Sequence, residues 1–243
     1  MIITSLENEK IKEYFKLKDK KTRDKTELFL VEGRHLVLEA YRNNLLKELL
    51  IENEEVMILD VETTYVTSEI INKLSDVETP QKMIGVCYKP TPKEDLGNKI
   101  LILDGVQDPG NLGTIIRSAM AFNIDSIILG ENTVDLYNPK VIAAAKGSFL
   151  RVQMFYQELL PVLEQSKMPV YGAYLEGESV HQLKLSKAGG YLVMGNEANG
   201  ISPALKPVIS HPVTIPSFSD TESLNVGIAT AILCDNFKRL SAS

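Results

Sequence analysis

The chain has 243 residues, of which 44% are hydrophobic and 24% charged, and its formal net charge is −6. This length fits one large domain or two small ones, and the composition is ordinary for a soluble globular protein. The negative charge argues against a surface that is basic throughout, but it leaves room for a local basic patch. No apolar run approaches the length of a membrane span, and the N-terminus lacks the regions of a signal peptide.

Two cysteines, Cys87 and Cys234, lie inside apolar runs and belong to no CxxC pair. We expect buried, reduced thiols, which suit the cytoplasm. The three histidines are scattered and lack the spacing of metal ligands, so we expect no metal site.

The first part of the chain alternates helical and strand-like patterns, which predicts a small α/β domain. Helices are expected over residues 5–20, 35–43 and 67–74. Strands are expected over residues 29–32, 46–51, 56–59 and 83–88. The stretch 89–98 contains two prolines, several charges and a glycine, so it predicts a boundary between domains at 1–92 and 98–243.

Residues 10–25 contain eight cations and three acids, so this stretch nets +5 although the whole chain is acidic. The cations are Lys10, Lys12, Lys16, Lys18, Lys20, Lys21, Arg23 and Lys25. The pattern is compatible with a surface that attracts a polyanion and equally with a solvated helix face.

The second part predicts a parallel sheet covered on both faces, because uninterrupted apolar strands alternate with helices. Strands are expected over residues 100–103, 126–129, 152–155, 170–174, 191–194 and 213–216. Helices are expected over residues 114–122 and 138–146. A capping box formed by Ser219 and Glu222 predicts a last helix, apolar on nearly every side over 224–233.

Three loops, at 104–113, 195–202 and 216–223, follow strands of this sheet and are therefore expected to be neighbours. The first has neither GxGxxG nor GxxxxGK, which disfavours a dinucleotide site or a phosphate-binding P-loop. Within or just beyond these loops lie polar side chains that either face a ligand or only hold turns and face solvent. They are Asn111, Arg117, Glu197, Ser223 and Asn225.

Three segments together resemble the motifs of the SpoU/TrmH-type RNA ribose 2′-O-methyltransferases of the SPOUT class. They are NLGTIIRSA (111–119), VMGNEANGIS (193–202) and IPSFSDTESLNVGIA (215–229), in the family's order and spacing. The pieces LKDKKTRDKTELFLVEGRHLVLEA (17–40) and TPQKMIGV (79–86) resemble that family's substrate-binding domain, which is similar to a small ribosomal protein.

The resemblance implies a C-terminal catalytic domain with a deep trefoil knot, an exception to the usual avoidance of knots. It also implies S-adenosylmethionine as cofactor, RNA as partner through the basic N-terminal region, and a homodimer. Matched position by position, the catalytic set is Arg117, Asn111, Glu197, Ser223 and Asn225. The cofactor-binding set is Met194, Gly195, Asn196, Ile201, Ile215, Pro216, Ser223 and Leu224.

Two positions depart from the family pattern, where Ala145 and Gly227 stand in place of frequent serines. Neither belongs to the matched catalytic set, but both weaken any inference about which nucleotide is modified. The function implied is methylation of a ribose 2′-hydroxyl in RNA, most simply ribosomal RNA. The alternatives are a tRNA ribose methyltransferase, a non-catalytic RNA-binding ribosome assembly factor, and a small-molecule methyltransferase or nucleotide-binding enzyme with an ordinary open sheet.

Overall fold

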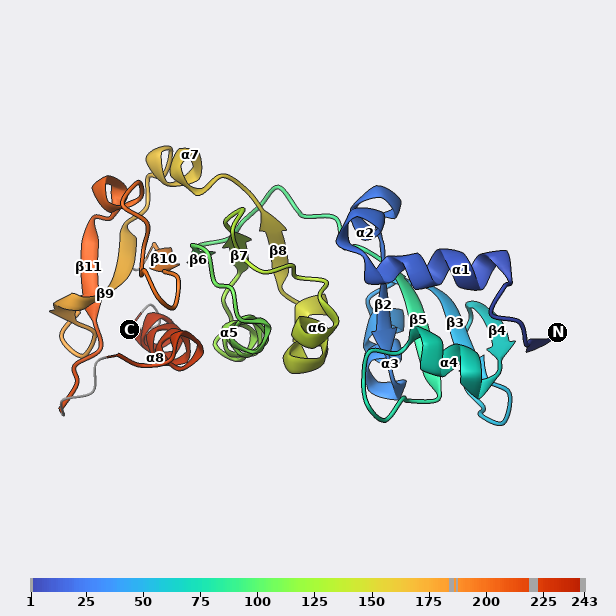
Figure 1. Ribbon diagram of the computed structural model, residues 1–243. Helices are drawn as coiled ribbons and strands as arrows, with labels where there is room; N and C mark the ends of the chain where they lie inside the picture. The colour runs from blue at the N-terminus through green and yellow to red at the C-terminus, as the bar shows by residue number, and fades with distance from the viewer. Residues whose placement is uncertain (1, 184–185, 187, 219–222, 241–243) are drawn as a thin grey trace. The chain divides into compact units, whose positions relative to one another are not determined.

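The computed structural model describes residues 2–183, 186, 188–218 and 223–240, and Figure 1 shows their elements. The chain divides into two compact units, each with its own sheet. The first unit comprises the chain up to Thr91 together with Tyr137–Leu150, and the second comprises Pro92–Leu136 and the chain from Arg151 onward. A short segment from the middle of the sequence thus packs with the N-terminal unit.

The first unit contains a five-stranded sheet in the order β1-β4-β3-β5-β2. The strands are β1 (Ile2–Ile3), β2 (Leu28–Glu32), β3 (Leu46–Glu52), β4 (Glu62–Val66) and β5 (Met83–Tyr88). The sheet is mixed, because β3 pairs in parallel with β4 and antiparallel with β5. The helices are α1 (Glu9–Phe15), η1 (Lys16–Lys18), α2 (Lys20–Thr26), α3 (Arg34–Arg42), α4 (Ser68–Leu74), α6 (Pro139–Ala145) and η2 (Ser148–Leu150).

The core of this unit lies between the sheet and the pair α1 and α4, which pack against each other. Ile11 and Ile70 from these helices meet Leu50 and Ile84 from the sheet, and all four are nearly inaccessible to solvent. Helix α3 packs on the opposite face, since Val37 approaches Gly85, the neighbour of Ile84 on β5.

Two predictions for this unit are wrong. The expected helix over 5–20 is broken after η1, because Asp19 leaves the helical conformation and its side chain accepts a hydrogen bond from the N–H of Thr22, which starts α2. The expected strand over 56–59 is absent, and Val56 and Ile58 are 71% and 91% exposed. Its place in the sheet belongs to β4, whose β-branched and aromatic residues suit a pleated surface.

The second unit contains a six-stranded sheet in the order β11-β9-β10-β6-β7-β8. All neighbouring strands run parallel, which confirms the predicted parallel sheet. The strands are β6 (Lys99–Leu103), β7 (Ser126–Leu129), β8 (Gln153–Tyr156), β9 (Val170–Ser179), β10 (Gly190–Met194) and β11 (His211–Thr214). The helices are α5 (Pro109–Ala121), α7 (Leu159–Glu164), η3 (Lys206–Val208) and α8 (Val226–Leu240).

Both faces of this sheet are buried. Ile100 and Ile102 pack with Leu159 and Leu163 of α7, while Leu101 and Leu103 point to the other face and are also fully buried. Helices α5 and α8 lie side by side (Figure 1) and pack against each other. This arrangement brings the N-terminal end of α8 near α5.

One buried cysteine lies in each unit, Cys87 on β5 and Cys234 on α8, and both are free thiols as predicted. Within the ranges given above, no helix has the length and apolar character needed to cross a bilayer.

Candidate active site

The loops after β6 and β10 lie next to each other, because these two strands are neighbours in the sheet. Hydrogen bonds connect the two loops. Asn196 donates from Nδ2 to the carbonyl oxygen of Gly105 at 2.7 Å. The backbone N–H of Ser202 donates to Oδ2 of Asp104 at 2.6 Å. The predicted proximity of these two loops is therefore confirmed, and side chains on each loop fix the position of the other.

Glu197 makes the densest set of contacts between these loops. Its carboxylate accepts hydrogen bonds from the N–H groups of Gln107 and Asp108, each at 3.2 Å, and from Nδ2 of Asn111 at 3.1 Å. Partial burial by itself raises the pKa of the carboxyl, but the bonds from Asn111 and from backbone N–H groups outweigh burial. The pKa of Glu197 therefore lies below its usual 4.5, and the side chain is ionised at neutral pH.

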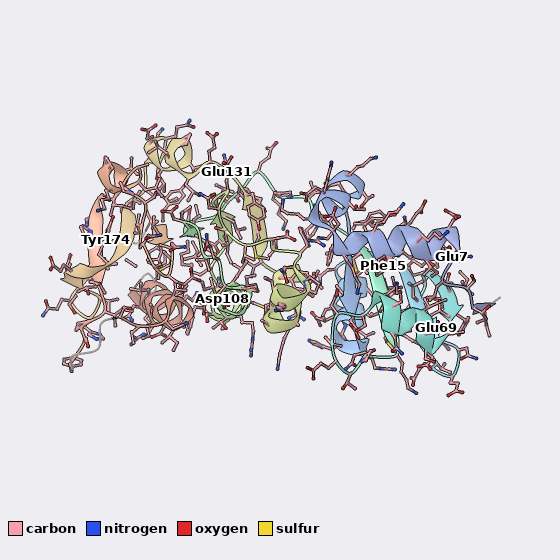
Figure 2. The ribbon with its side chains drawn as sticks, in the orientation of Figure 1. Glu7, Phe15, Glu69, Asp108, Glu131 and Tyr174 are labelled. Carbon is pink, nitrogen blue, oxygen red and sulfur yellow. The ribbon has the colours of Figure 1, made fainter. Side chains whose placement is uncertain are left out.

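The start of α5 decides where Asn111 lies. The helix begins at Pro109, five residues before the predicted start at Thr114, because Asp108 caps it by accepting from the N–H of Asn111 at 2.7 Å. Figure 2 labels Asp108 beside α5. Proline suits the first helical position since its missing N–H would have no partner there. Asn111 thus belongs to the first turn, and its side chain faces Glu197.

Asn225 connects the third loop to the other two. Its Nδ2 donates to Oδ1 of Asn111 at 2.8 Å, and its Oδ1 accepts from the N–H groups of Gly227 at 2.9 Å and Ile228 at 3.3 Å. Asn225 therefore caps α8 as well as holding Asn111. The predicted capping box of Ser219 and Glu222 lies outside the described residues. A continuous hydrogen-bonded chain, Asn225 to Asn111 to Glu197, joins all three loops.

Two of the predicted catalytic residues stand apart from this chain. Arg117 lies on α5, six residues after Asn111, with its side chain exposed. Neither Arg117 nor the exposed Ser223 has a hydrogen-bond or ion-pair partner within the described part of the chain. The structure thus brings together Asn111, Glu197 and Asn225 and leaves Arg117 and Ser223 open to a ligand or a second molecule.

The predicted cofactor-binding residues combine an apolar floor with a tight turn. Met194 and Ile201 are buried, Ile215 and Pro216 are half-buried, and Leu224 is exposed. In the turn between Met194 and Ile201, Asn196 and Gly200 exchange backbone hydrogen bonds of 2.9 Å each. The turn is so close that a Cβ on Gly195 would lie 2.1 Å from the carbonyl carbon of Gly200.

Comparison with known proteins decides the family. The sequence model of the SpoU rRNA Methylase family matches residues 98–235, more than half of the chain. The chain belongs to the SpoU rRNA methylase family. Its N-terminal part, residues 8–85, matches the MRM3-like substrate binding domain.

Relatives of this SpoU family protein match over nearly its whole length. The 23S rRNA (guanosine(2553)-2′-O)-methyltransferase RlmP of Bacillus subtilis (strain 168) is 37% identical over 95% of this chain and 96% of its own. A putative RNA methyltransferase of the TrmH family from Porphyromonas gingivalis has a TM-score of 0.88 at 34% identity and covers 97% of this chain and 99% of its own. The AdoMet-bound rRNA methyltransferase from Sinorhizobium meliloti has a TM-score of 0.87 at 28% identity, and the match covers 98% of this chain and 97% of its own.

Sequence reasoning missed three of the groups that build this SpoU family site. Asp104 accepts the N–H of Ser202, and the backbone N–H groups of Gln107 and Asp108 hold Glu197. Asp104 had a usable signal, because an acid directly after a fully apolar strand marks the carboxyl end of a sheet. Backbone donors leave no signal in a sequence.

The lowered pKa of Glu197 predicts how pH affects stability. Because the folded pKa is below the unfolded one, the stabilisation from this carboxylate is complete above pH 4.5 and is lost as pH falls through the folded pKa. The gain is modest since the side chain is exposed. We expect the Tm advantage of the wild type over Glu197→Gln to shrink between about pH 5 and pH 3 in thermal melts. An advantage that stays constant over this range contradicts the assignment.

Proposed function

We propose that this SpoU family protein transfers a methyl group from S-adenosylmethionine to a ribose 2′-hydroxyl of ribosomal RNA. The observation that carries the proposal is the chain Asn225 to Asn111 to Glu197, which joins the three motif loops at one edge of the sheet. Two relatives support it, one named as a 2′-O-methyltransferase of 23S rRNA and one crystallised with AdoMet.

The residues of the second and third loops fit S-adenosylmethionine. A buried apolar pair, Met194 and Ile201, lies beside an exposed turn whose backbone groups can meet the polar edge of an adenine. Exposed Leu224 and half-buried Pro216 offer further apolar surface. An apolar floor with a few polar groups is the usual make-up of a small-molecule site.

When bound, S-adenosylmethionine supplies an electrophilic methyl group on a sulfonium. The chain must then deal with the charge that grows on the ribose oxygen as its proton leaves. Arg117 is suited to this, because its guanidinium is exposed and has no partner in the described part of the chain. An arginine keeps its proton up to about pH 12, so we assign it to stabilising the alkoxide and gripping the adjacent phosphate. The proton passes to water or to a neighbouring group.

The roles of the other polar residues follow from their contacts. Glu197 has its carboxylate occupied by Asn111 and by two backbone N–H groups, so it positions the loops and does not reach for the substrate. Asn111 and Asn225 hold the motif-one helix against the third loop. Ser223 is exposed beside Asn225, a place suited to orienting the ribose.

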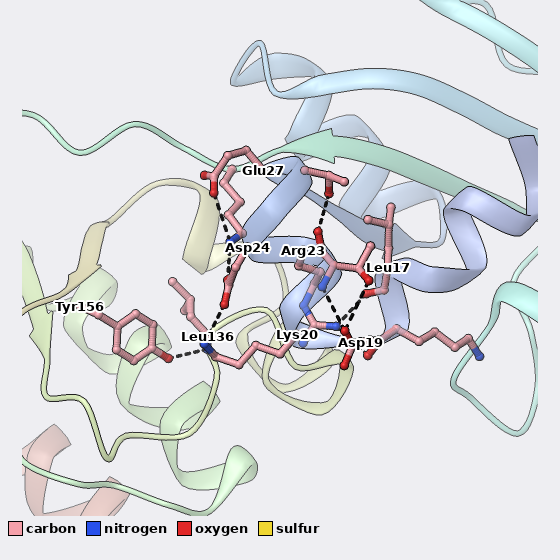
Figure 3. A network of polar contacts seen from close by, with 12 residues as sticks. Leu17, Asp19, Lys20, Arg23, Asp24, Glu27, Leu136 and Tyr156 are labelled. Atoms are coloured by element: carbon pink, nitrogen blue, oxygen red, sulfur yellow. Dashed lines mark hydrogen bonds and ion pairs between the residues drawn. The ribbon is translucent and has the colours of Figure 1, made fainter.

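We assign RNA binding to residues 1–92 and catalysis to residues 98–243, a division supported by the family matches to 8–85 and 98–235. The basic stretch 10–25 is not uniform. Arg23 is buried and donates to the carbonyl oxygens of Leu17 and Lys18 at 2.7 and 2.8 Å (Figure 3). Because it holds the turn before α2 together, it is a structural cation and not part of an RNA-binding surface.

Ion pairs within the first unit already engage half of the eight cations. Each of the four has an acidic partner within 3.0 Å, the pairs being Lys10 with Glu48, Lys12 with Glu7, Lys18 with Asp76 and Lys20 with Asp24. Lys16, Lys21 and Lys25 have no such partner in the described part of the chain. Lys21 and Lys25 are four residues apart on α2 and so share a face.

This difference predicts which lysines contact RNA phosphates. Changing Lys16, Lys21 and Lys25 together to Gln should weaken rRNA binding and reduce the slope of log K against log salt by about 2, since each lost phosphate contact removes roughly 0.7–0.9. Binding titrations at several salt concentrations measure this slope. The matched control changes the paired Lys12 and Lys20 to Gln and should leave the slope unchanged. Equal slopes for the wild type and the triple variant refute this assignment.

Three further features belong to the proposal. A homodimer is supported by exposed apolar side chains in the segment before α8, Phe218 at 92% and Leu224 at 46%, and in its first turn, Ile228 at 53%. Sedimentation velocity tests it directly. The trefoil knot is supported by full-length similarity to solved relatives. A cytoplasmic location is supported by two free thiols.

The proposed function is tested by incubating the protein with methyl-labelled S-adenosylmethionine and either ribosomal RNA or tRNA, then mapping the labelled nucleotide. Label on a ribose of rRNA is the expected result. Label only on tRNA supports a tRNA methyltransferase instead, and cofactor binding without any label supports a non-catalytic assembly factor.

A further inference from the structure

The first unit contains a pocket of about 670 Å³ that takes no part in the site described above. Its walls come from the end of β2, the start of α3, the segment 74–84 and α6. Pockets that hold a small molecule usually measure roughly 300–1,000 Å³, so this one has room for a nucleotide. The side chain of His35 fixes one wall, because its Nε2 lies 3.2 Å from the carbonyl oxygen of Lys146 beside α6.

The wall of the pocket is apolar on one side and carries an oriented acceptor on the other. Leu30, Leu36 and Ile84 contribute the apolar surface. Glu32 is held in place because its carboxylate accepts from the hydroxyl of Ser75 and, through Oε1, from the N–H of Gln81 at 2.7 Å. Its Oε2 has the Ser75 hydroxyl as its one partner in the described part of the chain, so it has capacity for one more N–H donor.

A cation without a partner borders the same pocket. Arg34 is the first residue of α3, its side chain is exposed, and it has no hydrogen-bond or ion-pair partner among the described residues. Arg42, at the other end of α3, contrasts with it, because its guanidinium pairs with Glu39 at 3.1 Å. The second acid of the wall, Asp76, is already compensated by Lys18 at 3.0 Å. Arg34 is therefore a cation that is available to a phosphate, while the neighbouring carboxylate of Glu32 is held by neutral donors and is available to an N–H donor.

We propose that this pocket receives one unpaired nucleotide of the RNA substrate, a nucleotide other than the one that is methylated. The base lies against the apolar wall and donates an N–H to Glu32, while Arg34 meets the phosphate. Proteins read RNA in this way where bases are unstacked and splayed out of the helix. The inference rests on the proposed function for its choice of RNA, and it gives the N-terminal unit a way to select a site by shape.

Two variants test the proposal without touching the active site. Ala143 is exposed on α6 and lines the pocket, so Ala143→Phe fills the space, while Ala143→Ser keeps it open and serves as the matched control. Arg34→Ala removes the phosphate contact, with Arg42→Ala as its control on the same helix. Binding of purified ribosomal RNA is measured for the full chain, with Tm and calorimetric S-adenosylmethionine affinity recorded for every variant.

We expect Ala143→Phe and Arg34→Ala each to raise the Kd for rRNA about 10-fold, with Tm, cofactor affinity and kcat at saturating RNA unchanged. The two controls should stay within about 2-fold of the wild type. Wild-type affinity in a normally folded Ala143→Phe overturns the pocket proposal, and if that variant melts early, wild-type affinity in Arg34→Ala does so. A wild-type protein that binds rRNA but transfers no label refutes the methyltransferase proposal alone.

Discussion

Replacing Arg117 by alanine should lower kcat about 10²–10³-fold while leaving the affinity for S-adenosylmethionine unchanged. The side chain is exposed, so its removal breaks no hydrogen bond or ion pair within the described part of the chain. The loss falls on the transition state, where negative charge develops on the ribose oxygen. Single-turnover methyl transfer to rRNA measures the rate, and calorimetry measures cofactor affinity.

A matched control separates this role from a general loss of positive charge. Arg239 lies on α8, is also exposed and pairs with Asp235 at 2.7 Å, so Arg239→Ala should retain full activity. Arg117→Lys keeps the charge but loses the planar fork that grips phosphate, and we expect an intermediate rate. Full activity in Arg117→Ala removes this residue from the mechanism.

Replacing Gly195 by alanine should abolish cofactor binding and destabilise the second unit by roughly 3 kcal/mol. The added Cβ would lie 2.1 Å from the carbonyl carbon of Gly200 and 2.2 Å from the nitrogen of Ile201. These are backbone atoms, which cannot rotate away as a side chain can. The turn would have to open, and the loop that carries Glu197 would move with it. Calorimetry with S-adenosylmethionine and thermal melts measure both effects.

The neighbouring Gly200 provides the control for this substitution. Its φ is +68°, but a Cβ there would meet no atom within 4 Å. Gly200→Ala should therefore cost only the backbone strain of a left-handed residue, about 1 kcal/mol, and retain cofactor binding. Equal losses in the two variants would mean that backbone conformation, and not the close approach at Gly195, limits the turn.

The parallel sheet was predictable because its strands are short, uninterrupted apolar runs that alternate with helices. Such runs indicate strands that are buried on both faces of a sheet. The start of α5 was not, since Gly110, Asn111 and Gly113 read as a loop. Asp108 and Pro109 override that composition by capping the helix. Val56 and Ile58 led to the opposite error, because their apolar character predicted a strand where the structure has an exposed loop. Apolar residues alone do not ensure that a segment pairs with a neighbouring strand.

The candidate site likewise has features that the sequence predicts and features that it does not. Glu197, Asn111 and Asn225 stood out as polar groups in glycine-lined loops and at helix starts, and the structure joins them. The backbone donors of Gln107 and Asp108 and the dual contact of Asn225 were beyond prediction, because each depends on how distant segments pack. The same holds for the basic stretch, where only the folded unit reveals that Arg23 is buried.

The two cysteines allow the opening of each unit to be measured separately by thiol labelling. Burial raises the pKa of the Cys87 thiol above its usual range and that of Cys234 to about 12, so neither forms the reactive thiolate while its surroundings stay closed. Modification by a thiol reagent then requires opening of β5 in one unit or of α8 in the other. Labelling rates at the two positions therefore follow the unfolding of the two units separately, in the unaltered chain.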